Sequence, residues 1–173
     1  MHIQKIVNAL PPLKSTTVII AQHMARGFIP SFIKRLKEHS INPIDKAHDG
    51  DTLQIGHVYV CIGYTEVVKR EGAYRVVQSP SPDTTYNPDI NLMFKSIVPF
   101  VDDFNLLSVI LTGIGEDGVE GCRLLGERKV RCLTETAESA VVDGMPLRAR
   151  EVVPNIEALS LDEIVEVIRG FCR

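Results

Sequence analysis

The sequence predicts an α/β fold of three layers, with helices covering both faces of a doubly wound, mainly parallel sheet. Short β-branched runs without polar alternation, such as TTVIIA at 16–21 and NLLSVILT at 105–112, are typical of strands buried on both faces. Segments with apolar residues at helical spacing come between these runs. Such an alternation favours a parallel sheet flanked by helices on both sides.

The helices are predicted from their apolar spacing and from their end signals. IQKIVNAL at 3–10 has helical spacing, and the two prolines that follow it end the segment. The last helix should begin after Ser160, because Glu163 stands three residues later, as in a capping box. The further helical segments are FIPSFIKRLKEH at 28–39, INLMFKSIVPF at 90–100, GVEGCRLLGER at 118–128 and SLDEIVEVIRGFC at 160–172.

The remaining strands are short pieces separated by glycines. HVYVCI, EVVKR and YRVVQ predict an antiparallel hairpin portion around residues 57–78, with REGA at 70–73 as the hairpin turn. KVRCLTE at 129–135 predicts one more strand of the parallel sheet. The proline-rich segment SPSPDTTYNPD at 79–89 is expected to be a loop that shapes a surface near a site.

Composition bounds the class of protein. A chain of 173 residues with 45% hydrophobic and 24% charged residues predicts one globular domain over residues 1–173. The net charge of -3 argues against a nucleic-acid partner. Without an apolar run of membrane-spanning length or a signal-peptide pattern, we expect a cytoplasmic protein with no membrane insertion. The four cysteines lack zinc spacing, so we expect reduced thiols, no metal and no other cofactor.

Two polar residues follow strongly predicted strands and are candidates for a site. His23 comes after TTVIIA, and Asp117 comes after NLLSVILT. In parallel α/β sheets, ligands bind outside the carboxyl ends of the strands, so the two side chains could meet there. A carboxylate beside an imidazole orients it and stabilises the imidazolium, as in a nucleophile-activating triad. The residues alone leave open that His23 is an ordinary structural histidine.

The turn that contains Asp117 has a second interpretation. Gly113-x-Gly115-x-x-Gly118 matches the dinucleotide-binding fingerprint, and Glu135 follows at about the 20-residue distance of that pattern. Glu116 and Asp117 argue against it, because their carboxylates would stand where a phosphate should lie. A third possibility is a tight turn whose acids cap the following helix.

Four segments, in order and at fitting intervals, resemble the catalytic domain of the chemotaxis receptor methylesterases, the CheB family. The shared features are QHM, TG-x-G-x-DG and GMP, and the resemblance covers nearly the whole chain. The segments are VIIAQHMARGFIPSFIKRL at 18–36, YNPDINLMFKSI at 86–97, VILTGIGEDGVEGCRLL at 109–125 and ETAESAVVDGMPLRA at 135–149.

The resemblance implies an ester hydrolase that acts on glutamyl methyl esters of chemoreceptors and deamidates receptor glutamines by Ser-His-Asp acyl transfer, releasing methanol from the esters. It makes His23 the general base and acid, and Asp117 the carboxylate that orients it. Partners would be methylated cytoplasmic segments of chemoreceptors, and other chemotaxis signalling proteins are a second class to test. The substrate and oxyanion neighbourhood would comprise Met24, Ile114, Gly115, Met145 and Pro146.

The chain departs from the family pattern in its first residues. The family carries its serine in a loop of the form G-A/S-S-T-G-G-P, between the first strand and the first helix. MHIQKIVNALPP aligns with that helix, so the resemblance implies an N-terminally truncated domain whose serine is expected just before Met1. No serine of the chain is a good substitute: Ser15 precedes its strand, and Ser139 would shape the pocket.

Two further departures follow. Cys61, Ile62 and Thr65 replace the alanine, proline and histidine of the family's A-P-G-x-x-H. We expect no receiver domain as part of this chain, and therefore no phosphorylation control within it. We therefore expect the chain to be inactive or nearly so. The alternatives are a degenerate non-catalytic module that binds chemotaxis proteins, and the nucleotide-binding domain considered above. Loss of the first strand should also leave two neighbouring strands with unpaired edges.

Overall fold

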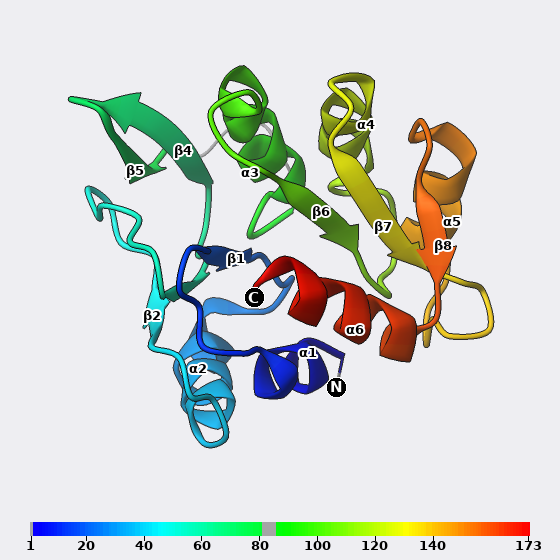
Figure 1. The fold of residues 1–173 in the computed structure, drawn as a ribbon, viewed down its shortest axis with the longest axis horizontal. Helices are drawn as coiled ribbons and strands as arrows, with labels where there is room; N and C mark the ends of the chain where they lie inside the picture. The colour runs from blue at the N-terminus through cyan, green and yellow to red at the C-terminus, as the bar shows by residue number, and fades with distance from the viewer. Residues whose placement is uncertain (1, 81–85) are drawn as a thin grey trace.

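The computed structural model describes residues 2–80 and 86–173, which form an α/β structure (Figure 1). Its helices are α1 (His2–Ala9), α2 (Ile29–Lys37), α3 (Ile90–Ile97), α4 (Val119–Glu127), α5 (Gly144–Val152) and α6 (Leu161–Phe171), with 3-10 turns η1 (Arg26–Phe28) and η2 (Val98–Phe100). Its strands are β1 (Val18–Ile20), β2 (Ile44–Lys46), β3 (Val58–Val60), β4 (Thr65–Arg70), β5 (Ala73–Gln78), β6 (Leu107–Ile110), β7 (Arg131–Glu135) and β8 (Glu157–Leu159).

The strands form two parallel sheets and one hairpin. The first sheet has the order β1-β3-β2, with Val18 and Ile44 both opposite Val58. The second has the order β6-β7-β8, with Leu107 opposite Arg131. β4 and β5 pair antiparallel. Among the described residues, no strand pairs with the second side of β1 or of β6, so each of these strands is a sheet edge.

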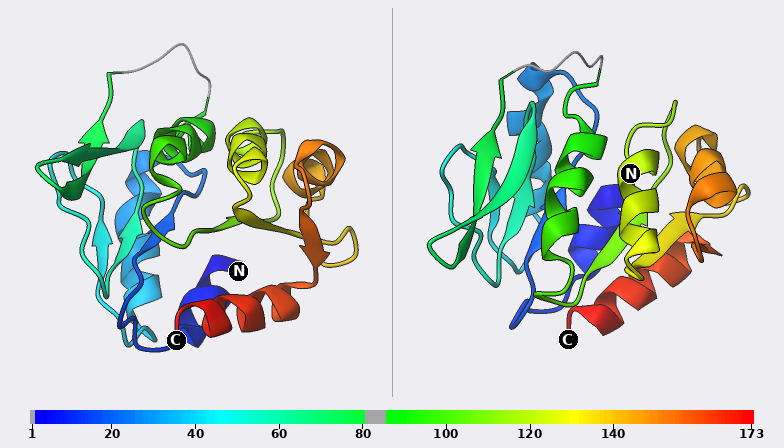
Figure 2. Two further views of the ribbon diagram at one scale, coloured as in Figure 1. Left: turned by 45° about the horizontal axis from the view of Figure 1, so that its top comes forward. Right: turned by 90° about the horizontal axis from the view of Figure 1, so that it is seen from above.

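Helices cover both faces of the sheets (Figure 2). α1, α2 and α6 lie on one face, where Val7, Phe32 and Leu36 are buried against the strands of the first sheet. α3, α4 and α5 lie on the opposite face, where Cys122 and Ala149 are buried with residues of the second sheet. The predicted three-layer class is confirmed. The candidate site lies where β1 and β6 end.

The predicted hairpin is confirmed, with a sharper boundary. β4 and β5 pair from Thr65–Gln78 to Arg70–Ala73. Glu71 and Gly72 form the turn with φ values of 53° and 77°, as a two-residue type I′ turn requires. Val58–Val60 lies within the predicted range of 57–78 but pairs in parallel with β1 and β2. All three residues of β3 are buried, which is typical of a central strand.

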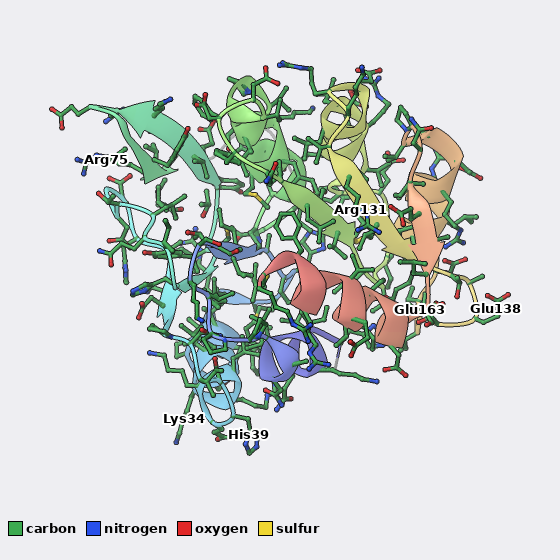
Figure 3. The ribbon with its side chains drawn as sticks, in the orientation of Figure 1. Lys34, His39, Arg75, Arg131, Glu138 and Glu163 are labelled. Carbon is green, nitrogen blue, oxygen red and sulfur yellow. The ribbon has the colours of Figure 1, made fainter. Side chains whose placement is uncertain are left out.

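Three elements were absent from the sequence-based prediction: β2, β8 and α5. β2 and β8 have only three residues each, too few for any period to show. α5 begins with Gly-Met-Pro, and its fixed position comes from long-range bonds rather than from a strong apolar stripe. In the segment KRLKEH at 34–39, Lys34 and His39 are exposed at one end of the molecule, while Leu36 between them is buried (Figure 3). Within the described ranges, no helix has both the length and the apolar character that crossing a bilayer requires.

The capping box of α6 generates a prediction for stability. The Ser160 side chain accepts a bond from the Glu163 backbone N–H, and the Glu163 carboxylate accepts one from the Ser160 backbone N–H at 2.8 Å. Glu163 lies at the start of α6 (Figure 3). We expect Ser160→Ala to lower the free energy of unfolding by about 1 kcal/mol at pH 7 in urea denaturation. Ser15→Ala, at an exposed position outside any element, is the control and should change it by less than about 0.5 kcal/mol.

The same box predicts a pH dependence. The Ser160 hydroxyl, followed by its backbone N–H, holds the pKa of the Glu163 carboxyl below its usual value. A carboxyl whose folded-state pKa is depressed adds stability above its unfolded pKa and loses it as pH falls through the folded pKa. The difference between the natural chain and Ser160→Ala should therefore shrink as urea titrations are moved from pH 7 toward pH 3. A difference that stays constant or grows would contradict this.

Candidate active site

His23 and Asp117 meet at the carboxyl ends of β1 and β6. His23 lies three residues after β1, and Asp117 lies in the turn between β6 and α4. The His23 Nε2–H donates to Asp117 Oδ2 at 2.6 Å, across 94 residues of sequence. The Asp117 side chain is fully buried and that of His23 is 28% exposed. The predicted meeting of these two side chains is present in the structure, with the histidine as the member that solvent or a ligand can reach.

The N-terminus of α3 holds Asp117 in place. The backbone N–H of Ile90 donates to Asp117 Oδ2 at 2.8 Å, and that of Asn91 donates to Oδ1 at 3.0 Å. These are among the N–H groups that a helix start leaves without intrahelical partners, at its positive end. A buried carboxylate needs such partners to remain ionised. Asp117 therefore accepts first-turn N–H groups of α3, whose own N-cap residue is Asp89, whereas the sequence had suggested capping of the helix that follows Asp117.

Tyr86 completes the environment of the imidazole. Its ring stacks on His23, with 5.3 Å between ring centroids and 16° between planes. Stacking and the bond to Asp117 together fix the imidazole plane, and Nδ1 is left as the nitrogen that can accept a proton. In the described part of the chain, no serine or threonine hydroxyl is hydrogen-bonded to His23. Residue reasoning missed Tyr86, although it belongs to the YNPDINLMFKSI segment that carries the family resemblance.

The glycines of the Gly113–Gly118 turn have structural roles. Gly115 and Gly118 have φ values of 84° and 85°, which L side chains rarely adopt. A Cβ on Gly113 would lie 2.4 Å from Met145 Sδ, and one on Gly118 would lie 2.7 Å from a methyl group of Ile90. The turn is thus shaped by packing and aims Asp117 at His23. Packing and backbone conformation account for these glycines, so the glycines do not support the nucleotide-binding interpretation.

The start of α5 fastens the same turn from the other side. The Met145 N–H donates to the Gly113 carbonyl at 2.8 Å, and the Gly113 N–H donates to the Val142 carbonyl at 3.0 Å. A Cβ on Gly144 would lie 2.7 Å from that Gly113 carbonyl oxygen. Three chain segments that are far apart in sequence therefore converge on the turn that carries Asp117: the end of β1 through His23, the start of α3 and the start of α5.

The five residues predicted for the substrate neighbourhood fall into two groups. Ile114 and Met145 line a cleft that also reaches His23, and Ile114 is 79% exposed. Gly115 faces Tyr86, because a Cβ on it would lie 3.0 Å from the Tyr86 hydroxyl. Met24 instead packs its side chain against the core below β1, and Pro146 is buried in the first turn of α5. The structure thus brings Ile114, Gly115 and Met145 to the histidine's side of the cleft, whereas the side chains of Met24 and Pro146 do not line it.

Ser139 and Glu135 form a separate buried cluster. Glu135 is fully buried and accepts bonds from the Thr112 N–H at 2.6 Å, the Ser139 hydroxyl at 3.1 Å and His2 Nδ1 at 3.1 Å. The Ser139 oxygen also accepts the Leu161 N–H at 2.8 Å. Ser139 is therefore engaged in holding the end of β7, in agreement with the expectation that it is no substitute nucleophile.

The thiols are no substitute either. All four cysteines are buried and free of disulfides. Burial raises the pKa of the Cys61 thiol to about 12 and also raises the pKa of Cys172, so both stay protonated at neutral pH. Over residues 2–80 and 86–173, no cluster of three or more histidine, cysteine or acidic side chains could hold a metal ion.

Comparison with known proteins identifies the family to which this site belongs. The family model described as CheB methylesterase matches residues 1–168. The chain belongs to the CheB methylesterase family. A crystal structure titled as the Thermotoga maritima CheB methylesterase catalytic domain superposes with a TM-score of 0.87 over 98% of this chain and 91% of that chain, at 23% identity. At that identity the superposition shows the shared fold.

Curated relatives of the CheB family carry the name protein-glutamate methylesterase/protein-glutamine glutaminase. The chain is 32% identical over 163 residues to number 1 of that name from Saccharophagus degradans, and 34% identical over 167 residues to the protein from Aliivibrio fischeri. These alignments cover 94% and 95% of this chain. The chain spans less than half the length of these two relatives, 44% in each case.

Two helical glycines give a prediction about the turn that aims Asp117. Gly144→Ala would force its Cβ against the Gly113 carbonyl, a backbone group that cannot move without shifting the turn. We expect a loss of about 1–3 kcal/mol in the free energy of unfolding, measured in urea. Gly170→Ala is the matched control, because it lies in α6 with open space around it. It should raise stability by about 0.5–1 kcal/mol. Equal effects of the two substitutions would contradict the packing role of Gly144.

Proposed function

We propose that this chain supplies the histidine and the carboxylate of a protein-glutamate methylesterase that acts on chemoreceptors, with glutamine deamidation as its second reaction. The observation that carries the proposal is the 2.6 Å bond between His23 Nε2 and the fully buried Asp117. Family membership gives this pair its context, since relatives that match most of the chain are named for both reactions.

The proposed chemistry is acyl transfer through a serine. His23 Nδ1 takes the proton of the serine hydroxyl as its oxygen attacks the ester carbonyl, and Asp117 stabilises the imidazolium that forms. The imidazolium returns the proton to the leaving methoxy group, so that methanol departs and a glutamyl-serine ester remains. Water then attacks this ester with His23 again as the base, and the products are the glutamate carboxyl group and the free serine. With a glutamine substrate, ammonia leaves in place of methanol.

The serine itself is proposed to lie in a segment ahead of Met1, as the family resemblance implies. Its hydroxyl has to reach Nδ1, because Nε2 is taken by Asp117. Ile114, exposed beside the site, is proposed to contact the receptor helix, while Gly115 and Met145 shape the floor. Met24 would act through its backbone N–H, whereas Pro146, which has no N–H, would only fix the start of α5. The receptor segments recognised are proposed to be the methylated cytoplasmic ones, and the protein is accordingly proposed to be cytoplasmic.

The test uses the chain extended at its N-terminus by a strand and the sequence Gly-Ala-Ser-Thr-Gly-Gly. We expect the extended chain to release methanol from methylated chemoreceptors, and the 173-residue chain to release none above background. In the extended chain, His23→Gln or Asp117→Asn should lower kcat by about 10³–10⁴-fold. His39→Gln is the matched control, since His39 is exposed and distant from the site (Figure 3).

Two results would contradict the proposal. Full hydrolysis by the 173-residue chain would show that the nucleophile lies within it. Activity in the His23→Gln variant within tenfold of the extended chain would remove His23 from the mechanism. Capture of receptor cytoplasmic segments without any hydrolysis by the extended chain would favour a non-catalytic binding module instead.

A further inference from the structure

One short segment contacts both members of the pair formed by His23 and Asp117. The ring of Tyr86 stacks on the imidazole of His23, with 5.3 Å between ring centroids. The backbone N–H groups of Ile90 and Asn91, which follow in the same segment, donate to the Asp117 carboxylate at 2.8 and 3.0 Å. The segment before and at the start of α3 therefore orients the imidazole through a side chain and the carboxylate through its main chain.

The segment is itself held in place just after Tyr86. Asp89 is the N-cap of α3, and its Oδ1 accepts the Leu92 N–H at 2.7 Å. The Asp89 N–H donates to the Gly63 carbonyl at 3.3 Å, which ties the segment to the connection between β3 and β4. α3 packs in turn against β4 and α4. Tyr86 thus belongs to a helix start whose position is set by its neighbours.

The ring of Tyr86 packs against both of the loops that carry the pair. It stacks on His23, which follows β1. At its hydroxyl end, a Cβ placed on Gly115, in the turn after β6, would lie 3.0 Å from the Tyr86 oxygen and 3.8 Å from two ring carbons. A side chain at position 115 would therefore displace the ring, and glycine leaves room for it.

The bond to Asp117 alone leaves the imidazole torsional freedom. The bond from His23 Nε2 to Asp117 Oδ2 at 2.6 Å restrains the tip of the ring. The second side-chain torsion of histidine is broad, so the ring plane can still turn about the Cβ–Cγ bond and move Nδ1. Because the planes of His23 and Tyr86 are only 16° apart, such a turn drives an edge of the imidazole into the tyrosine ring. The stack therefore fixes the direction in which Nδ1 points.

The stacked ring also acts on charge and on water. A cation over the face of an aromatic ring, within about 6 Å of its centroid, is attracted by the electrons of that ring. The imidazolium of His23 that forms in acyl transfer has this position relative to Tyr86. Asp117 is fully buried and 28% of the His23 side chain is exposed, so solvent approaches the bond between them from the histidine. Tyr86 covers one face of that histidine.

We propose that Tyr86 is a positioning residue of this site. Its ring holds the imidazole in the plane in which Nε2 bonds Asp117 and Nδ1 remains available, and it shields the Nε2–H from exchange with water. The ring and not the hydroxyl has this role, because the stack is made by the aromatic face. The inference rests on the proposed function in its kinetic consequence, whereas the shielding of the Nε2–H is independent of any hydrolysis.

The first experiment records the proton resonance of the His23 Nε2–H by NMR, in the 173-residue chain with isotopically labelled histidine. The resonance that disappears in His23→Gln is assigned to this group, which separates it from the other histidines. In Tyr86→Leu, exchange of this proton with water should be faster by about tenfold or more, because the ring that protects it is gone. In Tyr86→Phe, which keeps the ring, the exchange rate should stay within about threefold of that in the natural chain.

The second experiment measures methanol release by the extended chain that carries Gly-Ala-Ser-Thr-Gly-Gly. Tyr86→Leu should lower kcat by about 10–100-fold, because a displaced Nδ1 no longer meets the serine hydroxyl. KM should stay within about threefold, since the stack contacts the histidine and not the substrate. Tyr86→Phe should keep kcat within about threefold of the extended chain, because the stacking face is retained.

Phe104→Leu is the matched control, because it also replaces an aromatic ring by leucine. Phe104 comes just before β6 and Asp117 comes after it, so the two residues belong to opposite ends of that strand. The Phe104 ring contacts Tyr74 edge-on and is partly exposed. Both kcat and the exchange rate of the His23 proton should stay within about twofold in this variant. Thermal unfolding of each variant is measured, so that only folded proteins are compared.

The outcomes separate this inference from the proposed function. Unchanged proton exchange in Tyr86→Leu overturns the inference, whether or not the extended chain is active. Faster exchange in Tyr86→Leu alone, with no methanol release by the extended chain, supports the positioning role and overturns the proposed hydrolysis. A raised KM at unchanged kcat overturns the inference, because Tyr86 then binds the receptor. Equal losses in Tyr86→Phe and Tyr86→Leu overturn it too, because the hydroxyl and not the ring is then responsible.

Discussion

The buried carboxylate of Asp117 is the contact on which the site depends. An ionised group with no solvent exposure is costly unless bonds to its charged form replace the lost water, and here two N–H groups of α3 and the imidazole of His23 do so. α3 is held in turn by α4, because the Asn91 side chain accepts the Gly121 N–H at 2.8 Å. The position of Asp117 therefore depends on the packing of α3 against α4 as well as on the turn that carries Asp117.

The sequence indicated that His23 and Asp117 could meet, because each follows a strongly apolar strand and such strands end at one edge of a parallel sheet. The residues alone left open an ordinary structural histidine, and only the family resemblance gave the pair its roles. The capping of α6 was equally local and is confirmed by the bonds of Ser160 and Glu163. The stack of Tyr86 on His23 was not predictable, since it joins segments with no shared period. β2 and β8 were missed for a similar reason: three residues each are fixed by pairing with β3 and β7, not by their own pattern.

Among the described residues, the break between β1 and β6 leaves two half-sheets that share helices but no ladder. Contacts across the break include the packing of α1 with α6, the apolar cluster around Met93 and Ile97 of α3 that joins Ile19 to Leu106, and the bond between His23 and Asp117. The bond between His23 and Asp117 therefore also contributes to holding the two half-sheets together.

The choice of ring nitrogen at His23 has a steric consequence. Asp117 occupies Nε2, at the outer end of the imidazole, so proton transfer falls to Nδ1, the nitrogen adjacent to the side chain's attachment to the main chain. A hydroxyl that serves as its partner must therefore approach the imidazole on the side nearer the backbone of His23, opposite the side that Asp117 occupies.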